Sequence, residues 1–407
     1  MLEEHFMTML GLQQYFISKT EIVQDHFHIW VWPKQTLYIC PLCKRATGAI
    51  HSHWITSLKS LPILGYRTLI HIPHFRIRCE CQSHPVSIEI AIRMPGFQVT
   101  RRLAQAIIEA ARDMPLKLVS RLYGVNWNTA RDIDREYLKS RIESADPVAP
   151  NSIGVDEVSY RRGHRYLTLV CDRDTHRLIF VTKGRRCENL AEFFTSRIDP
   201  AASRCLEAVS MDMWDPYEKA IRQHAPQAAI IYDRFHLIRM VNDCVDQVRR
   251  REQKRLEEEG CRLLKHHRYL FLRGQERLKP DQQQTLAEIL RQNEPLESAY
   301  ILKEQFRQLY DLAPTPQDTT PSFVQKGFQI LIGWMNKVAE SGLSPFLQFA
   351  KSLKKRYMGV LNYFRYPLTN GLSEGLNNKI ATLSKRAYGF RNMEYFTLKI
   401  YQQGGFI

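Results

Sequence analysis

The segment from Ser152 to Tyr232 constrains the fold most, because its hydrophobic pattern changes partway along. It begins with three short apolar runs that have the length and the flanking turns of strands. Helices and strands then alternate. The pattern predicts strands at Ser152–Val158, Tyr166–Cys171, Leu178–Thr182, a run ending at Met211, and Ala228–Tyr232, with helices at Glu188–Arg197 and Pro216–His224. Such an order indicates a mixed α/β sheet.

Two carboxylates occupy comparable places in these strands. Asp156 lies inside an apolar strand, and Asp212 directly follows the apolar run that ends at Met211. A lone buried charge is costly unless it is paired or binds a metal, and the ends of strands in open α/β sheets are common ligand sites. Each aspartate alone is more often a turn residue or a half-exposed acid. The pair is therefore more informative than either member.

A third carboxylate, Glu374, is the only acidic residue between Ser341 and Met393, where nine residues are lysine or arginine. Helical spacing places it on the same face as Asn377 and Lys385, opposite a buried leucine-rich face. The ordinary structural explanation is an exposed acid near a helix N-terminus, which the helix dipole favours. The basic surroundings argue for the alternative, a carboxylate that faces a groove beside Lys385 and Arg386.

The chemistry of phosphodiesters connects these three acids. Mg²⁺ prefers oxygen ligands and is commonly shared between carboxylates and substrate phosphates. Two such ions, about 3.5–4 Å apart, stabilise both the attacking and the leaving oxygen of an in-line displacement at phosphorus. We therefore expect Asp156, Asp212 and Glu374 to hold two Mg²⁺ or Mn²⁺ ions.

The overall charge points to a polyanionic partner. The chain of 407 residues has 58 lysines and arginines against 42 aspartates and glutamates, a formal net charge of +16. A generally basic, soluble surface would show the same surplus, whereas contact with nucleic-acid phosphates releases condensed counterions. The sequence has no apolar run long enough to predict a membrane span. Its first residues are acidic and lack the features of a signal peptide. A cytoplasmic protein, associated with the nucleoid when bound to DNA, is expected.

Residues 101–142 have the pattern of a helix-turn-helix. Leu103, Ile107 and Ala111 share one helical face, and Leu116–Tyr123 supplies a second helix that Gly124 ends. A third helix would then enter the major groove with its first turns near the bases. Any three-helix unit could show this pattern. The expected DNA-contacting residues are Asn126, Trp127, Asn128, Thr129, Arg131 and Arg135.

Two cysteine pairs suggest a zinc site. Cys40 and Cys43 form a C-x-x-C pair, and Cys79 and Cys81 form a distant C-x-C pair. Four thiolates bind Zn²⁺ in a tetrahedral arrangement. His84 would serve as the fourth ligand if Cys81 pointed away. A disulfide is disfavoured in the cytoplasm, and two unrelated buried pairs remain an alternative to a structural zinc.

Several separated blocks resemble the DDE transposases of bacterial insertion sequences, in particular the ISL-three family. The resemblance runs over most of the chain, and its blocks are IGVDEVSYRRGHRYLTLV, VSMDMWDPYEKAI, APQAAIIYDRFHLIRMVNDCVDQVRR and TNGLSEGLNNKIATLSKRAYGFRN. It implies a ribonuclease H-like fold with Asp156 and Asp212 on adjacent strands and Glu374 on a late helix. The separation of Asp212 and Glu374 implies an all-helical insertion, which agrees with the helical pattern from Phe235 to Tyr363.

The segment Asp233–His236 also resembles the D-x-x-H motif of transposases that carry such insertions. Asp233 would cap a helix and His236 would point towards the site, where it would position a DNA phosphate or a flipped base without binding metal. A capping aspartate beside a packed histidine is an equally good explanation. Asn377 is expected to assist at the same site.

The sequence thus predicts a multidomain DNA transposase that binds terminal inverted repeats and catalyses metal-dependent strand cleavage and strand transfer. Its partners would be the element ends and target DNA, with a homodimer or higher oligomer in the synaptic complex. The rivals are a zinc and helix-turn-helix regulator with a non-catalytic core, and a ribonuclease H-like nuclease that cuts without joining. The expected parts are a zinc-binding β segment (1–95), the helix-turn-helix (96–145), the first part of an α/β ribonuclease H-like core (151–236), an all-α insertion (237–363) and the C-terminal core helix (364–407).

Overall fold

The protein is described from a computed structural model, which covers residues 2–161, 165–261, 263–311, 321–368, 371–387 and 389–406. Its contacts divide the chain into two compact units. The first comprises the chain up to Ala145 together with Thr382–Gln402, and the second comprises Asp146–Ala381 and Gln403–Phe406. Among the described helices, none combines the length and the apolar character that a membrane crossing requires.

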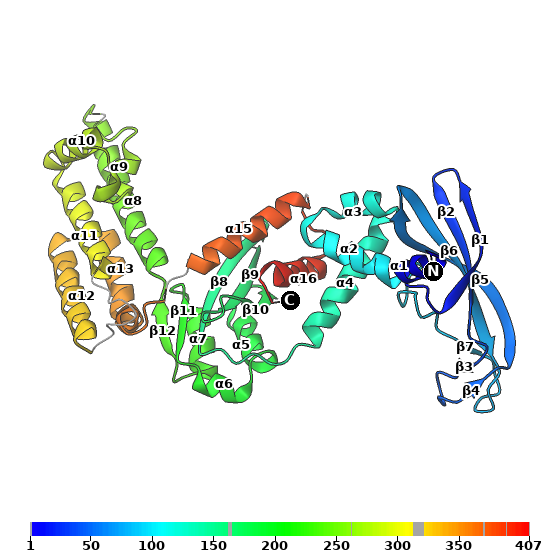
Figure 1. The fold of residues 1–407 in the computed structure, drawn as a ribbon. Helices are drawn as coiled ribbons and strands as arrows, with labels where there is room; N and C mark the ends of the chain where they lie inside the picture. The colour runs from blue at the N-terminus through cyan, green and yellow to red at the C-terminus, as the bar shows by residue number, and fades with distance from the viewer. Residues whose placement is uncertain are drawn as a thin grey trace. The chain divides into compact units, whose positions relative to one another are not determined.

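A twisted antiparallel-rich sheet forms the N-terminal part of the first unit (Figure 1). Its strand order is β1-β2-β6-β5, and β7 pairs with β6. Residues alternate between its faces, so Ile29, Val31 and Ile70 pack inward with helix α1, whereas His28 and Trp30 remain on the outer face. The elements are α1 (Leu2–Leu10), β1 (Tyr15–Val23), β2 (His26–Pro33), β5 (Ile50–Ile63), β6 (Tyr66–Ile77) and β7 (Val86–Ser87), with a separate short pair β3 (Tyr38–Ile39) and β4 (Ala46–Thr47).

Three helices with clear end signals follow this sheet. Thr100 caps α2 (Arg101–Asp113) by accepting a hydrogen bond from the Leu103 amide. Gly124 ends α3 (Leu116–Tyr123) with φ of 63°, a left-handed conformation that glycine adopts without strain. Asn126 then caps α4 (Trp127–Glu143) through the Asn128 amide. These bounds agree with the predicted helix-turn-helix.

The C-terminal helix α16 (Met393–Gln403) packs in the same unit. Asp134 of α4 is fully buried and accepts hydrogen bonds from Tyr395 Oη at 2.6 Å and from Lys399 Nζ at 3.1 Å. Lys399 also donates to the Ala111 carbonyl at 2.8 Å. The segment 364–407, expected as one part of the core, is therefore divided, because its last helix buries its polar side chains against the helix-turn-helix.

The second unit is built on a five-stranded sheet in the order β10-β9-β8-β11-β12 (Figure 1). The first three strands form an antiparallel meander, and β11 and β12 run parallel to β8. This is the mixed sheet that the sequence predicts, because helices connect the parallel strands. The bounds are β8 (Ser152–Arg161), β9 (Arg165–Asp172), β10 (Leu178–Lys183), α5 (Cys187–Ser196), α6 (Pro200–Cys205), β11 (Ala208–Met211), α7 (Asp215–His224) and β12 (Ala229–Tyr232).

Helix α8 begins directly after β12 and leads into a group of helices (Figure 1). Helices α11 and α13 pack against it, and their apolar side chains are continuous with the core of the sheet. The helices are α8 (Arg234–Glu258), α9 (Arg268–Leu272), α10 (Pro280–Arg291), α11 (Glu294–Asp311), α12 (Pro321–Ser341), α13 (Ser344–Lys354), α14 (Tyr357–Leu361) and α15 (Gly371–Arg386). Short 3₁₀ turns occur at Gln275–Arg277 and Asn362–Phe364.

The N-terminal sheet is larger than the sequence indicated. In the sequence, β-rich structure is expected over residues 36–92, where apolar and basic residues alternate at Phe75–Cys79, whereas β1 and β2 begin earlier, at Tyr15 and His26. Histidine and tryptophan alternate with apolar residues in β2, and four consecutive polar residues, 18–21, interrupt the apolar residues of β1. The weak apolar periodicity of β1 hid a strand that backbone pairing with β2 creates.

Candidate active site

The register of the parallel strands brings the predicted aspartates together. Ser210 of β11 pairs with Gly154 of β8, so continuing both strands by two residues places Asp212 level with Asp156. On the other side, Met211 pairs with Tyr232 of β12, which places Asp233 level with Asp212. The Asp233 amide donates to the Met211 carbonyl at 2.8 Å and extends this pairing. Carboxylates from three adjacent strands thus meet at one edge of the sheet.

Asp156 is held by two hydrogen bonds. Its Oδ1 accepts from the Glu157 amide at 2.7 Å, and its Oδ2 accepts from Asn377 Nδ2 at 3.1 Å. Burial, together with the nearby charge of Asp212, raises the pKa of Asp156 to about 6. Helix α15 therefore reaches the site through Asn377, a residue that the sequence assigned an auxiliary role.

Asp212 and Asp233 contact helix α8. His236 Nδ1 lies 3.1 Å from Asp212 Oδ2, and this hydrogen bond raises the pKa of His236. Asp233 is buried and caps α8 by accepting from the Phe235 amide at 3.1 Å, and burial raises its pKa. Asp233 thus caps the helix, and His236 points at Asp212.

Glu374 lies in α15, three residues before Asn377. Its side chain lies outside the described part of the chain. The other basic residues expected near it, Lys385 and Arg386, are exposed in the last turn of the same helix. The structure thus connects α15 with Asp156 through Asn377.

A buried cation that the sequence analysis missed lies behind these carboxylates. Arg173 is 6% exposed, and its Nη2 donates to Ser210 Oγ at 2.6 Å. It crosses β8 at Gly154, where a Cβ atom would lie 2.5 Å from Arg173 Nε. The negative charges of Asp233 and Asp156 favour its protonated form, while burial lowers its pKa. In the sequence, the one indication of this close approach is Gly154, because a glycine inside a strand often marks a place where another group lies against the backbone.

A second missed group lies beside the site. Arg185 Nη1 contacts Glu157 Oε1 at 3.1 Å, and its guanidinium lies 4.2 Å from the ring centre of Tyr166 and 4.7 Å from that of Trp214. Trp214 follows Asp212 by two residues, and its amide donates to the Asp212 carbonyl at 2.7 Å. No local motif predicts this arrangement, because its members come from β8, β9, the turn after β10 and the turn after β11.

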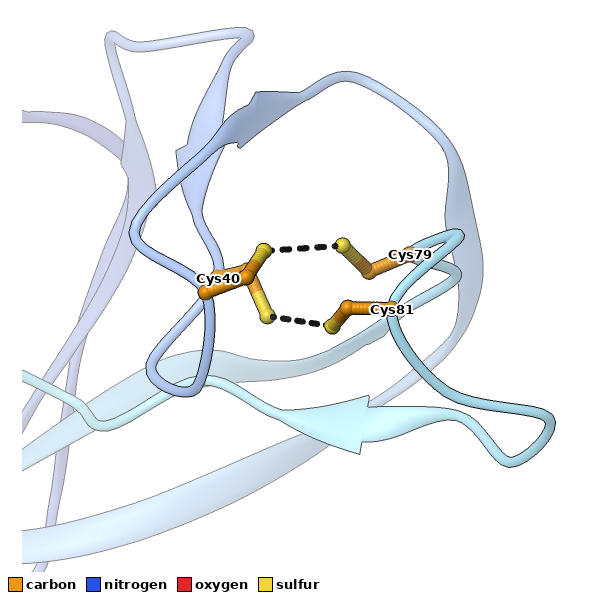
Figure 2. A group of neighbouring side chains, drawn as sticks. Cys40, Cys79 and Cys81 are labelled. Carbon is orange, nitrogen blue, oxygen red and sulfur yellow. Dashed lines mark hydrogen bonds between the residues drawn. The ribbon is translucent and has the colours of Figure 1, made fainter.

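The four predicted cysteines converge in the first unit. Their sulfur atoms all lie within 4.8 Å of one another, with Cys40 and Cys81 3.6 Å apart and Cys43 and Cys79 3.4 Å apart. Figure 2 shows Cys40 facing Cys79 and Cys81, which follow strand β6. Zn–S bonds of about 2.3 Å in a tetrahedron would place sulfurs roughly 3.8 Å apart. His84 is exposed and does not belong to this group.

The predicted DNA-contacting residues lie at the start of α4. Asn126 caps the helix, and Trp127 and Asn128 are exposed in its first turn. The Arg131 side chain is already engaged within the protein, because it forms an ion pair with Asp132 at 2.8 Å and lies over the Trp127 ring. Arg135 lies 3.6 Å from the same carboxylate, and Thr129 is half-buried.

Comparison with known proteins agrees with this architecture. Residues 153–400 match a family described as transposase, and residues 95–138 match the helix-turn-helix domain of transposase family ISL3. The chain is 30% identical over 407 residues to the transposase for insertion sequence element IS1001 of Bordetella parapertussis, covering 98% of each chain. It is 29% identical over 263 residues to the transposase for insertion sequence element IS1557 of Mycobacterium tuberculosis, covering 59% of this chain and 57% of that protein.

Among solved structures, the Drosophila P element transposase strand transfer complex matches 75% of this chain and 91% of its own, with 11% identity and a TM-score of 0.38. That likeness is too low to support a fold assignment. The family matches and the full-length relative are sufficient by themselves. They show a helix-turn-helix followed by a DDE transposase core, and the chain is accordingly a DNA transposase that belongs to family ISL3.

Proposed function

We propose that Asp156, Asp212 and Glu374 bind two divalent cations, Mg²⁺ or Mn²⁺, and that these carboxylates carry both DNA cleavage and strand transfer. The observation that carries the proposal is the strand register that places Asp156 and Asp212 side by side. The hydrogen bond from Asn377 supports a location of α15 beside the same edge. The DDE family match of residues 153–400 is consistent with this chemistry.

Glu374 is proposed as the third ligand from its place in α15. Residues three apart on an α-helix share a face, so Glu374 emerges from the face that carries Asn377. It is also the only acid in a basic stretch of the chain. A carboxylate in such surroundings is better suited to a cation and a phosphate than to open solvent.

The described donor atoms fit a hard cation. Burial and the charge of Asp212 raise the pKa of Asp156, and a bound cation would relieve the repulsion between the two acids. The buried Oδ1 of Asn377 has no hydrogen-bond partner within the described residues. Mg²⁺ takes carboxylate and amide oxygens of this kind and keeps water in its remaining positions.

Two ions bound there would stabilise the attacking and the leaving oxygen at phosphorus. Neighbouring side chains would hold the metal-binding carboxylates in position. His236 donates to Asp212 and thereby fixes the carboxylate, and Asp233 fixes the start of α8 and hence the place of His236. Water would act as the nucleophile in cleavage and a freed 3′-hydroxyl in strand transfer. A contact between His236 and a DNA phosphate or flipped base is part of this proposal.

The first unit is proposed to recognise the terminal inverted repeats. The exposed first turn of α4 offers Asn126, Trp127 and Asn128 to base edges, followed by Thr129 and Arg131, and Arg135 lies one turn further. Lys385 and Arg386 would contact the DNA backbone. Joining two ends requires them to be held together, so a homodimer or higher oligomer is proposed for the synaptic complex.

The remaining features complete the proposed architecture. The meander β8–β10 with parallel β11 and β12 is consistent with a ribonuclease H-like core, in which the helices described between residues 237 and 363 would form an all-α insertion. The cluster of Cys40, Cys43, Cys79 and Cys81 is proposed to bind a structural Zn²⁺. Backbone hydrogen bonds from Cys43 and Leu42 lower the pKa of Cys40 to about 6, which favours the thiolate that zinc requires.

The proposed catalytic site is tested by replacing each acid with its amide: Asp156→Asn, Asp212→Asn and Glu374→Gln. Each replacement preserves the shape of the side chain and removes the charge that binds metal. We expect cleavage and joining of element-end DNA in Mg²⁺ to fall below detection, while binding to that DNA remains. Gel assays of cleavage, strand transfer and binding on one end-containing duplex measure all three.

Glu207→Gln is the matched control, because Glu207 is an exposed acid of the same unit, at the start of β11 and away from its catalytic end. This variant should cut and join like the unmodified protein. Mg²⁺-dependent strand transfer by Asp156→Asn would overturn the assignment of that residue. Loss of activity in all four variants would show that charge removal acts nonspecifically.

A further inference from the structure

Two neighbouring hollows open beside the catalytic edge of the second unit. The larger, of about 920 Å³, is lined by residues that include Tyr166, Lys183, Arg186 and Trp214. The smaller, of about 320 Å³, is lined by Arg222, Lys355 and Arg356 among others. Both hollows include Asp215 and Lys219 in their walls, so they adjoin each other along helix α7. We call them together the basic track.

The track begins at the candidate active site. Trp214 lines the larger hollow, and its amide is hydrogen-bonded to the carbonyl of Asp212. Its indole Nε1 donates to the Arg185 carbonyl at 3.0 Å, and the Arg185 guanidinium contacts the rings of both Trp214 and Tyr166. Arg185 also pairs with Glu157, the neighbour of Asp156. This cation is therefore held in place before any ligand arrives.

The acids of the track are partly neutralised. Arg356 pairs with both Asp215 and Glu218 across the smaller hollow. The other carboxylate of the larger hollow, Glu188, is exposed in the first turn of α5. The lysines and arginines that line the two hollows outnumber these acids, so the walls carry a net positive charge.

Five further cations of the track have no carboxylate within ion-pair distance in the described parts of the chain. They project from the end of β10, from the loop before α5, from α7 and from the end of α13. They are Lys183, Arg186, Lys219, Arg222 and Lys355. Cations that outnumber the carboxylates beside them repel one another, and a polyanion would relieve that repulsion.

We propose that the basic track binds the phosphodiester backbone of a DNA strand that leaves the catalytic carboxylates, passes Trp214 and follows α7. This inference rests on the proposed catalytic site, because the strand is defined by where it is cut. The residues of the track lie outside the helix-turn-helix and outside the proposed metal ligands. Successive phosphates along one strand match a row of cations, whereas a single small anion would occupy only part of it.

The first test measures the salt dependence of DNA binding. The triple variant Lys183→Gln, Arg186→Gln, Lys219→Gln removes cations without removing the Arg185 contacts. Each lost phosphate contact should reduce the slope of log affinity against log salt by roughly 0.9, so the triple variant should lose about 2 to 3. The probe is a duplex that carries an element end, with Ca²⁺ replacing Mg²⁺ so that binding is measured without cutting.

The control removes the same charge elsewhere in the second unit. Arg204, Lys254 and Lys279 are exposed cations outside both hollows, and all three are replaced with glutamine. This control should keep the salt slope of the unmodified protein. An equal loss of slope in both triple variants would overturn the proposal, because binding would then depend on net charge and not on this track.

The second test needs no substitution. Cys187 lines the larger hollow and is half-buried, whereas Cys205 and Cys261 are exposed outside the track. We expect DNA to slow alkylation of Cys187 by iodoacetamide, measured at each cysteine by mass spectrometry, and to leave Cys205 and Cys261 unchanged. Inorganic phosphate at the same phosphate concentration should not protect Cys187. Protection by phosphate alone would contradict a strand-binding track, as would unchanged alkylation of Cys187 with DNA.

The two proposals fail in different ways. If Asp156→Asn abolishes cleavage but DNA leaves Cys187 unprotected, only the basic track is wrong. If Asp156→Asn still cuts while DNA protects Cys187, the assignment of the metal ligand is wrong and the track remains. We expect Asp156→Asn to lose cleavage and to keep the protection of Cys187.

Discussion

His236 Nδ1 lies 3.1 Å from Asp212 Oδ2, so the first turn of α8 touches the carboxylate that ends β11. The side chain of His236 is one-third exposed and that of Asp212 one-fifth, which places the pair at the border between core and solvent. The histidine thereby fixes one oxygen of the Asp212 carboxylate. This contact joins the helical region to the edge of the sheet where Asp156, Asp212 and Asp233 meet.

Replacing His236 should therefore weaken the site without destroying the fold. His236→Ala removes the donor that orients Asp212, and partners of this kind typically contribute 10- to 100-fold to metal affinity or activity, so cleavage should fall by about that factor. Measuring the cleavage rate over a range of Mg²⁺ concentrations quantifies this loss, and a higher Mg²⁺ concentration should restore part of the rate. Arg239→Ala, one turn further along α8, is the control. A His236→Ala enzyme with an unchanged Mg²⁺ dependence would refute this role.

The cysteine cluster should bind one zinc ion per chain. Cys43→Ser or Cys79→Ser removes one of the four thiolates, and we expect the bound zinc to be lost and the melting temperature of the first unit to fall. Elemental analysis and thermal melts measure these effects. His84→Ala and Cys205→Ser should retain the metal, because neither residue belongs to the cluster. Zinc retention by Cys79→Ser would favour another ligand set.

The buried contact between α4 and α16 should dominate the stability of the first unit. Asp134 and Lys399 are both almost fully buried and lie 3.1 Å apart. Asp134→Ala leaves the lysine charge uncompensated, so the free energy of unfolding should fall by about 3–5 kcal/mol in chemical denaturation. The control Asp132→Ala breaks a more exposed pair with Arg131, and it should cost at most about 1 kcal/mol. Similar losses in both variants would contradict the importance of burial.

Lys303 should make the stability of the second unit depend on pH. Burial lowers its pKa to about 8 from 10.5, while its Nζ donates to the Phe271 and Arg273 carbonyls at 2.8 Å. Above the folded pKa the unfolded chain still holds a proton that the folded chain has released, so raising the pH favours folding. Between pH 8 and about 9.5 this should add roughly 2 kcal/mol.

The comparison that isolates this effect uses Lys303→Met, which keeps the length of the side chain and removes the titrating amine. The variant should be less stable above the folded pKa, because two carbonyls lose the donor that the neutral amine supplies. Its unfolding free energy, measured by denaturant titration, should lack the rise that the unmodified protein shows above pH 8. Parallel pH profiles for the two proteins would show that Lys303 does not titrate in this range.

Local patterns predicted much of this structure because they depend on neighbours in the chain. The caps at Thr100 and Asn126 and the left-handed Gly124 fix the helix-turn-helix from side chains within a few residues. The strands from Ser152 to Tyr232 likewise follow from apolar runs and turns. Asp156 and Asp212 were found because a charge at a strand position is unusual, and the four cysteines because their pairs are close in sequence.

The tertiary structure alone decided which of these groups meet. The parallel register of β8, β11 and β12 sets Asp156, Asp212 and Asp233 level with one another, and backbone hydrogen bonds between distant segments fix that register. Contacts of the same long range bring Arg173 across Gly154, Arg185 against two aromatic rings, and Lys399 against Asp134. The sequence by itself determined the helices of the helix-turn-helix and the strands from Ser152 to Tyr232, and it placed Asp156 and Asp212 in those strands. Only packing decided their partners, because a side chain's neighbours in space are not its neighbours along the chain.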